Sequence, residues 1–222
     1  MAEALLHRGF RVALPEPRGI APSSGPMHGL TFIDLASDMA DVIRAEAPRD
    51  GAIVAGHAYG AWIARCLGQS FPDLVNGLAF LAAGARAWPA HLSDAISAIN
   101  NPETSDEDRR AALGLAFFAK GNDPADWMSG WHPEVVAMQR EARAGTDPAD
   151  WRPAGTAPIL DLRGAEDPFR PKGTENDVEE ELGPRVTAEV LPGTSHALPA
   201  ERPEKAAEIL ARWAKTCLRT TR

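Results

Sequence analysis

Two loops in the last third of the chain carry a carboxylate and a histidine, the residue types of a proton-transfer site. Asp167 ends the sequence Gly-Ala-Glu-Asp, and His196 ends the sequence Gly-Thr-Ser-His. A histidine can act as a general base near neutral pH, and a neighbouring carboxylate fixes its tautomer and stabilises the imidazolium. We therefore predict Asp167 and His196 as the acid and the base, with Asp161 or Glu166 as alternative acids.

A third motif lies earlier in the chain, where Gly56-His57-Ala58-Tyr59-Gly60 follows an apolar run and opens a helical run. This layout of strand, sharp turn and helix is that of the G-x-S-x-G nucleophile elbow, whose middle residue attacks a carbonyl carbon. The middle residue here is Ala58, and a methyl group cannot act as a nucleophile. The chain therefore has the frame of a nucleophilic site without its nucleophile.

Five short apolar runs, alternating with segments of helical periodicity, are predicted to be strands. The strands are expected at Arg11–Leu14, Ala52–Ala55, Val75–Leu81, Pro158–Leu162 and Val186–Leu191. This alternation is typical of α/β proteins with a mostly parallel sheet flanked by helices. Each of the three motifs follows one of these strands. Open α/β sheets bind their ligands at the carboxyl ends of parallel strands, so the motifs should meet there.

The predicted helices have recognisable end signals. Thr31 and Asp34 form a capping box at the start of one helix, which Pro48–Gly51 is expected to end. Further helical segments are expected over Met1–His7 with Gly9 past its end, from Ala61 to about Gln69, over Glu179–Glu181 as a solvated face, and over Pro203–Cys217.

The composition indicates one soluble domain and excludes some partners. The 222 residues are 44% apolar and 24% charged, with a formal net charge of -8. A nucleic-acid partner or an anionic membrane surface would favour a basic face instead. No apolar run approaches the ~18 residues of a membrane span, and the N-terminus does not have the pattern of a signal peptide. Cys66 and Cys217 are expected to be buried thiols in a reducing cytosol, so a cytoplasmic location is predicted.

The pattern changes between residues 84 and 156, where helical segments are broken by Pro, Gly and Asn. Four of the six tryptophans lie in this region: Trp88, Trp127, Trp131 and Trp151. We interpret residues 84–156 as a helical insertion, or cap, in a core that consists of residues 1–83 and 157–222.

With these motifs together, the chain resembles the α/β-hydrolase superfamily over nearly its whole length. The residues that carry the resemblance are Pro17–Gly19 with Ser23–Pro26, Gly56–Gly60, Gly164–Asp167, and Leu191–His196 followed by Glu201-x-Pro203. The resemblance implies a nucleophile position at Ala58, a base at His196, an orienting acid at Asp167 and an oxyanion donor at the Tyr59 N–H. It also implies an apolar pocket roofed by Trp88, Trp127 and Trp131, and no cofactor.

The chain departs from the family pattern in two places. Ala58 replaces the nucleophile, which relatives supply as Ser, Asp or occasionally Cys. The family sheet also begins with three more strands, and the loop after the third supplies a second oxyanion donor. Met1 falls within the helix that follows that loop, so the first strands and the oxyanion loop are expected to be missing, as in a truncated or decayed reading frame.

Three functions follow from this resemblance and its departures. The parent activity is hydrolysis of a small apolar ester or a related electrophile, with negligible acyl-enzyme turnover expected from a chain that carries Ala58. One alternative is a His196–Asp167 dyad that works without a nucleophile, as in lyase-type and cofactor-free oxygenase relatives. Another is a non-catalytic protein that binds a small apolar ligand. The six histidines show no close pairing of the kind that binds metal, and the sequence leaves the oligomeric state open.

Overall fold

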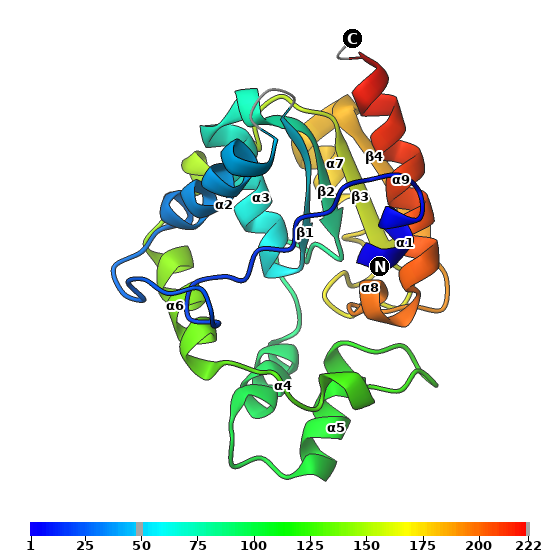
Figure 1. Ribbon diagram of the computed structural model, residues 1–222. Coiled ribbons are helices and arrows are strands. Elements are labelled where there is room, and N and C mark those ends of the chain that lie inside the picture. The colour runs from blue at the N-terminus through cyan, green and yellow to red at the C-terminus, as the bar shows by residue number, and fades with distance from the viewer. Residues whose placement is uncertain (48–50, 221–222) are drawn as a thin grey trace.

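The computed structural model describes residues 1–47 and 51–220 and contains one parallel sheet (Figure 1). Its four strands lie in the order β1-β2-β3-β4, with every neighbouring pair parallel. Their bounds are Ala52–His57 for β1, Val75–Leu81 for β2, Ile159–Gly164 for β3 and Val186–Leu191 for β4. The predicted α/β fold class and four of the five predicted strands are confirmed.

The predicted strand at Arg11–Leu14 is wrong. This segment has no regular secondary structure, and the Leu14 side chain is mostly exposed. An isolated strand is not stable, because its backbone groups need a neighbouring strand as a hydrogen-bonding partner. Among the described residues β1 pairs with β2 alone, so β1 is an edge strand and Arg11–Leu14 does not extend the sheet.

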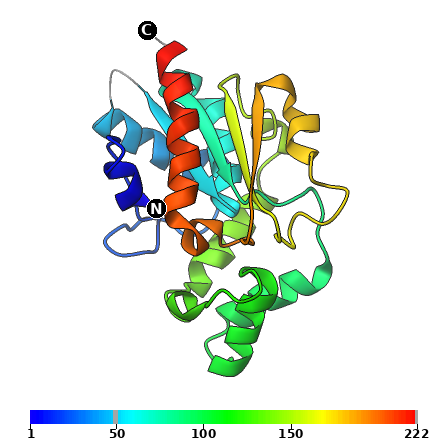
Figure 2. The ribbon, with the colours of Figure 1, turned by 90° about the vertical axis from the view of Figure 1, so that its right-hand side faces the viewer.

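Helices cover both faces of the sheet (Figures 1 and 2). On one face, α1 (Ala2–Leu6) contacts α9 (Pro203–Thr220), which runs along β2 and β3. On the other face, α3 (Tyr59–Ser70) packs on β1 and β2, α2 (Phe32–Glu46) packs on α3, and α7 (Asp177–Leu182) packs on β4. Successive residues of β2 alternate between the two cores: Leu78 and Phe80 face the α3 side, whereas Ala79 and Leu81 face α9.

The capping box predicted for α2 is confirmed. The Thr31 hydroxyl accepts a hydrogen bond from the Asp34 backbone N–H, and the Asp34 carboxylate accepts one from the Thr31 backbone N–H. The Thr31 hydroxyl also donates to the Asp34 carboxylate at 2.7 Å, and this bond, together with the one from the Thr31 N–H, lowers the pKa of Asp34. The α2 helix ends at Glu46, and most of its predicted terminator lies at positions 48–50, outside the described residues.

The segment between β2 and β3 consists of helices and loops, and it lies beyond the carboxyl ends of the strands (Figure 1). Its apolar cluster includes Phe117 and extends to Phe169 and Ala197, which belong to the loops after β3 and β4. This segment therefore packs directly on the loops that hold Asp167 and His196. The predicted cap bounds of 84 and 156 stay a prediction. The helices of the segment are α4 (Ala90–Asn100), α5 (Asp106–Ala116) and α6 (Pro133–Ala144).

Short helical turns complete the secondary structure. The α8 helix covers Leu198–Glu201, and single 3₁₀ turns cover Pro72–Leu74, Ala125–Trp127, Pro148–Asp150 and Gly183–Arg185. Within residues 1–47 and 51–220, no helix combines the length and the apolar character that crossing a bilayer requires. Cys66 and Cys217 are buried and form no disulfide, as expected.

Candidate active site

The elbow predicted around Ala58 is formed as a sharp turn between β1 and α3. Ala58 has φ 50° and ψ -114°, a backbone conformation that non-glycine residues rarely adopt. Its N–H donates to the carbonyl of Leu81 at 3.0 Å, which ties the turn to the end of β2. A Cβ at Gly56 would lie 2.2 Å from the Gly60 carbonyl oxygen, so the turn requires glycine there. The backbone geometry of an elbow is thus present with a methyl group at its apex.

Asp167 and His196 are brought together as a buried pair. The Nδ1 atom of His196 lies 2.9 Å from one carboxylate oxygen of Asp167 and 3.1 Å from the other. A carboxylate accepts, so Nδ1 carries the hydrogen, and in the neutral ring Nε2 keeps the lone pair that can take a proton. The Phe169 backbone N–H donates to the same carboxylate at 2.9 Å and helps to fix its orientation.

The two alternative acids lie elsewhere. Asp161 is fully buried and accepts two hydrogen bonds of 3.0 Å from Arg170, so it serves as an internal ion-pair partner. Glu166 is exposed. Among the three carboxylates considered, the structure pairs Asp167 with His196.

Direct backbone contact fixes the acid loop against the histidine loop. A Cβ at Gly164 would lie 2.3 Å from the Ser195 carbonyl oxygen, so only glycine allows the two loops to approach so closely. The Glu166 N–H donates to the Thr194 carbonyl at 2.9 Å, and the Ser195 hydroxyl donates to the Glu166 carbonyl at 3.2 Å. The separation of Asp167 and His196 therefore follows from the backbone path of both loops.

Glu201 joins the histidine loop to the helical segment. Its carboxylate accepts hydrogen bonds from the Ser195 N–H at 2.6 Å, from the Ala119 N–H at 2.7 Å and from the Asn122 side chain at 2.6 Å. The sequence marked Glu201 as part of a motif, but its position beside the histidine loop gave no sign of partners near residue 120. The groups that donate to Glu201 are identified only by the tertiary structure, which brings these segments together.

His57 connects the elbow to the histidine loop. Its Nε2 atom lies 2.7 Å from the His196 carbonyl oxygen, and a carbonyl can only accept, so Nε2 carries the hydrogen. Burial, together with the nearby His196, lowers the pKa of His57 to about 4, which keeps the ring neutral at pH 7. His57 therefore acts as a fixed donor that holds the backbone of His196.

Aromatic rings surround the His196 side chain. The ring centroids of Phe169 and Phe117 lie 4.3 Å and 5.4 Å from that of His196. Both phenylalanines were missed by the sequence analysis, because an isolated Phe in a loop or at a helix end carries no local signal. The predicted tryptophans lie one ring further out: Trp88 is 5.7 Å from Phe169, Trp131 is 5.8 Å from Phe117, and Trp127 is 6.1 Å from His57.

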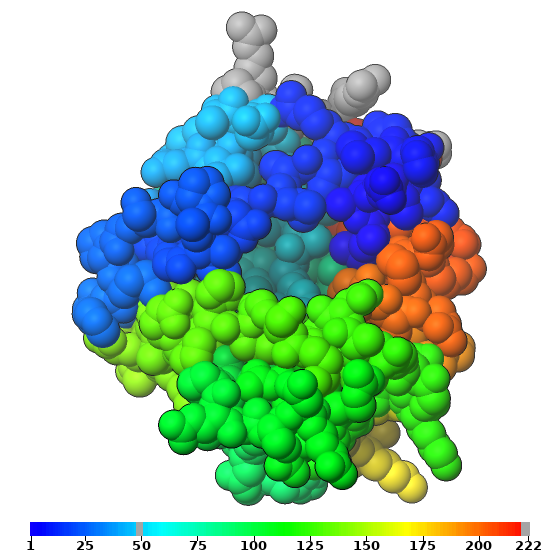
Figure 3. All heavy atoms as spheres, turned by 60° about the horizontal axis from the view of Figure 1, so that its bottom comes forward, coloured from blue at the N-terminus to red at the C-terminus, as the bar shows by residue number. Residues whose placement is uncertain are grey.

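The two parts of the site differ in exposure. The side chains of His196 and Asp167 are 6% and 1% exposed, whereas Ala58 is partly exposed. Figure 3 shows a hollow bordered by the N-terminal segment in blue, the helical segment in green and the C-terminal segment in orange. The atoms at its floor are dark cyan.

In the part of the chain that the structure describes, no cluster of three or more His, Cys, Asp or Glu side chains could hold a metal ion.

Tyr59 follows Ala58 and starts α3. Its hydroxyl donates to the Gln139 carbonyl on α6 at 2.7 Å, so the side chain anchors the helical segment on α3, and burial raises its pKa. Its backbone N–H has no acceptor among the described residues. This N–H is the group to which the resemblance assigned the oxyanion.

Comparison with known proteins agrees with this architecture. Several solved structures cover nearly the whole chain: Rv0554 from Mycobacterium tuberculosis (22% identity, 96% of this chain and 82% of that chain, TM-score 0.77), a thermophilic esterase from Thermogutta terrifontis with malate bound (21%, 97% and 85%, TM-score 0.73), and a bromoperoxidase from Bacillus anthracis (20%, 96% and 84%, TM-score 0.73). At these identities the likeness shows a shared fold. No curated protein matches the chain. The family model described as "alpha/beta hydrolase fold" matches residues 1–126, more than half of the sequence, and the chain therefore belongs to the α/β-hydrolase fold family.

Proposed function

We propose that this chain carries a hydrolase-type site for a small, largely apolar ester or a related electrophile. In the proposed site His196 is the base, and Ala58 stands at the nucleophile position. One observation carries the proposal: His196 and Asp167 form a buried pair at 2.9 Å, whereas Ala58 occupies the apex of a correctly formed elbow. Relatives of the same fold include proteins named as an esterase and as a bromoperoxidase, which supports the hydrolase class.

The proposed roles follow from the atoms that face the site. The Nε2 atom of His196 takes the proton of the attacking group and later returns it to the leaving group, while Asp167 stabilises the imidazolium. The Tyr59 N–H is the proposed donor to the developing oxyanion. Trp88 and Trp127 are proposed to line the apolar substrate pocket, together with Trp131.

Ala58 limits what this site can do. Removing the nucleophile of a catalytic triad lowers the rate by roughly six orders of magnitude in a well-studied protease, and binding and oxyanion stabilisation account for what is left. We therefore expect negligible acyl-enzyme turnover from the chain as it stands. A hydroxyl at position 58 would complete the sequence of nucleophile, base and acid.

The test is the Ala58→Ser variant, assayed with 4-nitrophenyl butyrate. We expect kcat/KM to rise by roughly 10³-fold over the unmodified chain, which is less than a complete triad supplies because a single oxyanion donor is assigned. Ala55→Ser is the matched control, since it adds the same hydroxyl three residues earlier on the exposed part of β1. A gain equal to that of Ala55→Ser, or one that survives His196→Ala, would contradict the proposal.

A second candidate function is favoured by the completeness of the dyad. His196 and Asp167 are positioned although position 58 holds no oxygen, and such a pair could activate water or abstract a substrate proton directly. An activity of this kind should be lost in His196→Ala and unchanged in Ala58→Ser. Saturable quenching of tryptophan fluorescence by an apolar ester, with no turnover, would support ligand binding alone.

The cap and the location of the protein are also proposed. We infer that residues 84–156 form the roof of the substrate pocket, because their apolar cluster contacts the loops of Asp167 and His196. The two buried thiols, Cys66 and Cys217, fit a reducing compartment and support a cytoplasmic location. Cell fractionation with an antibody to this chain would test that location.

A further inference from the structure

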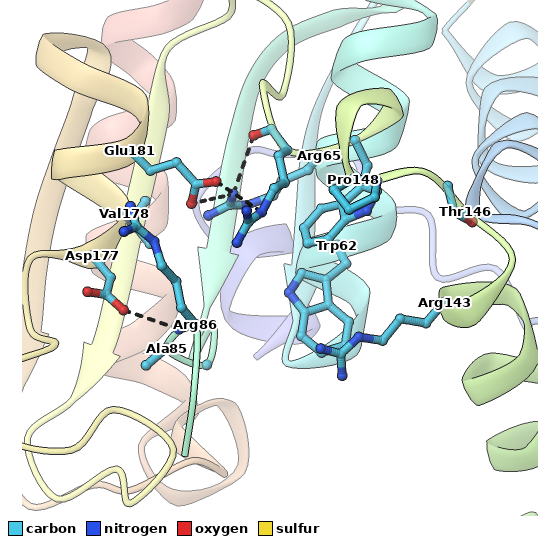
Figure 4. Close-up of a pocket in the computed structure, with 13 residues that line it drawn as sticks. Trp62, Arg65, Ala85, Arg86, Arg143, Thr146, Pro148, Asp177, Val178 and Glu181 are labelled. Carbon is cyan, nitrogen blue, oxygen red and sulfur yellow. Dashed lines mark hydrogen bonds and ion pairs between the residues drawn. The ribbon is translucent and has the colours of Figure 1, made fainter.

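A cavity of about 270 Å³ lies on the α3 side of the sheet (Figure 4). Its walls come from α3, from the loop after β2, from the end of α6 and the loop that follows it, and from α7. Ala58, Asp167 and His196 do not line it. The cavity is thus separate from the site proposed for ester hydrolysis.

The charge of the cavity opposes that of the whole chain. Four arginines and two carboxylates line it, an excess of two positive charges in a protein whose formal net charge is -8. A concave site of one charge sign attracts ligands of the opposite sign. The charged residues are Arg65, Arg86, Arg143, Arg152, Asp177 and Glu181.

Both carboxylates of the cavity already have partners. Glu181 lies 3.1 Å from Arg65 and 3.5 Å from Arg152, so the prediction of a solvated face is wrong for this residue. Asp177 accepts a hydrogen bond from the backbone N–H of Arg86 at 3.1 Å. Among the described residues, the guanidinium groups of Arg86 and Arg143 pair with no carboxylate.

Arg143 is held over an aromatic surface. Its guanidinium carbon lies 4.3 Å from the ring centroid of Trp62, a cation–π contact that fixes its position at the edge of the cavity (Figure 4). Trp151 also lines the cavity. A ligand that enters would therefore meet a flat apolar surface and a guanidinium group together.

Arg65 is a buried charged residue in the wall of the cavity. It is 6% exposed, and its Nε atom is buried with no acceptor among the described residues, whereas its Nη1 atom donates to Glu181 and to the Arg152 carbonyl. A buried donor of a charged group is costly when it lacks an acceptor. Arg65 contributes positive charge to the wall of the cavity.

We propose that this cavity binds a small organic dianion with a flat apolar body, of the class of an aryl phosphate or an aromatic dicarboxylate. The planar fork of a guanidinium matches the oxygen atoms of phosphate and carboxylate groups. Two negative charges would balance the excess of the arginines, and an aromatic body would lie beside Trp62 and Trp151, the two tryptophans that line the cavity. The volume of about 270 Å³ is slightly below the usual range of roughly 300–1,000 Å³ for ligand pockets, which suits a small ligand.

An aromatic wall separates this cavity from the catalytic pair. Trp62 stacks on Trp88, with ring centroids 6.2 Å apart, and Trp88 packs edge-on against Phe169. Phe169 in turn contacts the ring of His196. The proposed anion site goes beyond the proposed ester hydrolysis, and its test needs no nucleophile at position 58.

Isothermal titration calorimetry of the unmodified chain at pH 8 and low salt tests the proposal. We expect phenyl phosphate, phthalate or both to bind saturably, and phenol and inorganic phosphate to bind at least about tenfold more weakly, because each lacks either the charge or the ring. The stronger of phenyl phosphate and phthalate identifies the class of anion. Added NaCl should weaken binding of either dianion.

Variants at the edge of the cavity sharpen the test. Arg86→Gln and Arg143→Gln should each weaken binding by about tenfold, and both positions are exposed, so the variants should fold. Arg140→Gln is the matched control, because it removes the same charge from the same helix at an exposed position that does not line the cavity. The proposal is overturned if neither dianion binds, if phenol binds equally well, or if Arg140→Gln weakens binding as much as Arg143→Gln.

Discussion

The two parts of the candidate active site differ in how completely they are built. His196, the proposed base, and Asp167, the proposed acid, form a buried pair with supporting backbone bonds, and aromatic rings enclose it. Around Ala58 the turn is formed, but its apex carries a methyl group, and it follows an edge strand that has one neighbour among the described residues. One part contains the proposed base and acid, and the other contains the turn without a nucleophilic side chain.

This difference shows that the geometry of an elbow does not depend on its nucleophile. Gly56 allows the close approach of the Gly60 backbone, and the Ala58 N–H is bonded to Leu81, so the turn is determined by the backbone. The dyad is different, since it depends on contacts of Asp167 and His196 with residues far away in the sequence. Both structures are therefore present in a chain that has no nucleophilic side chain at position 58.

The largest expected effect concerns the acid, in the Ala58→Ser background. Asp167→Asn should lower kcat/KM for 4-nitrophenyl butyrate by roughly 10³-fold, because an amide cannot stabilise the imidazolium or hold the correct tautomer of His196. Glu166→Gln is the matched control, and this exposed neighbour should have little effect. If Asp167→Asn and Glu166→Gln lower kcat/KM by the same factor, Asp167 is not the orienting acid.

The second-largest expected effect concerns the elbow, and it should lower the free energy of unfolding. Gly56→Ala should lower the free energy of unfolding by about 3 kcal/mol, because the new Cβ would meet backbone atoms that cannot move aside. Gly60→Ala should change it by less than about 1 kcal/mol, since a Cβ there meets nothing within 4 Å. Urea denaturation of both variants measures the difference, and equal values would mean that the close approach at Gly56 is not required.

The smallest effect concerns His57, which joins the two parts. The folded protein lowers the pKa of His57 to about 4, whereas the unfolded chain takes up a proton near the ordinary pKa of about 6.5. The unfolded state then binds more protons between these values, so stability falls as the pH is lowered. We expect His57 to account for about 1 kcal/mol of the loss between pH 7 and pH 5.5.

Urea denaturation at both pH values, compared with His57→Gln, isolates this contribution. The glutamine amide can still donate to the His196 carbonyl but does not titrate, so the pH-dependent loss should be smaller in this variant. His91→Gln, at an exposed position, should leave the pH dependence unchanged. An identical loss in the unmodified chain and in His57→Gln would show that His57 does not titrate as a buried residue.

Much of the fold could be predicted because its signals are local. The apolar runs that became β1 to β4, the capping box at Thr31 and the turn motif around Ala58 each lie within a few neighbouring residues. Local patterns also gave one wrong strand. Arg11–Leu14 has an apolar run but no neighbouring strand, and the sequence of a segment does not show whether a partner is present.

The order of the motifs along the chain was enough to propose the candidate dyad, but not its surroundings. Phe117 and Phe169 reach the His196 ring from separate loops, and Glu201 bonds to residues about 80 positions away. The arginine cavity likewise combines α3, α6 and α7, so four arginines scattered along the sequence gave no sign of a common site.

The sequence by itself determined the strands of the sheet, the order of the motifs and the absence of a nucleophile at Ala58, because each is written in adjacent residues. Tertiary structure alone decided which carboxylate faces His196, which rings enclose it and where the arginines gather. The physical reason is that hydrogen bonds, ring contacts and ion pairs act over a few ångströms. Only folding brings residues such as Arg65 and Glu181, more than a hundred positions apart, within that distance.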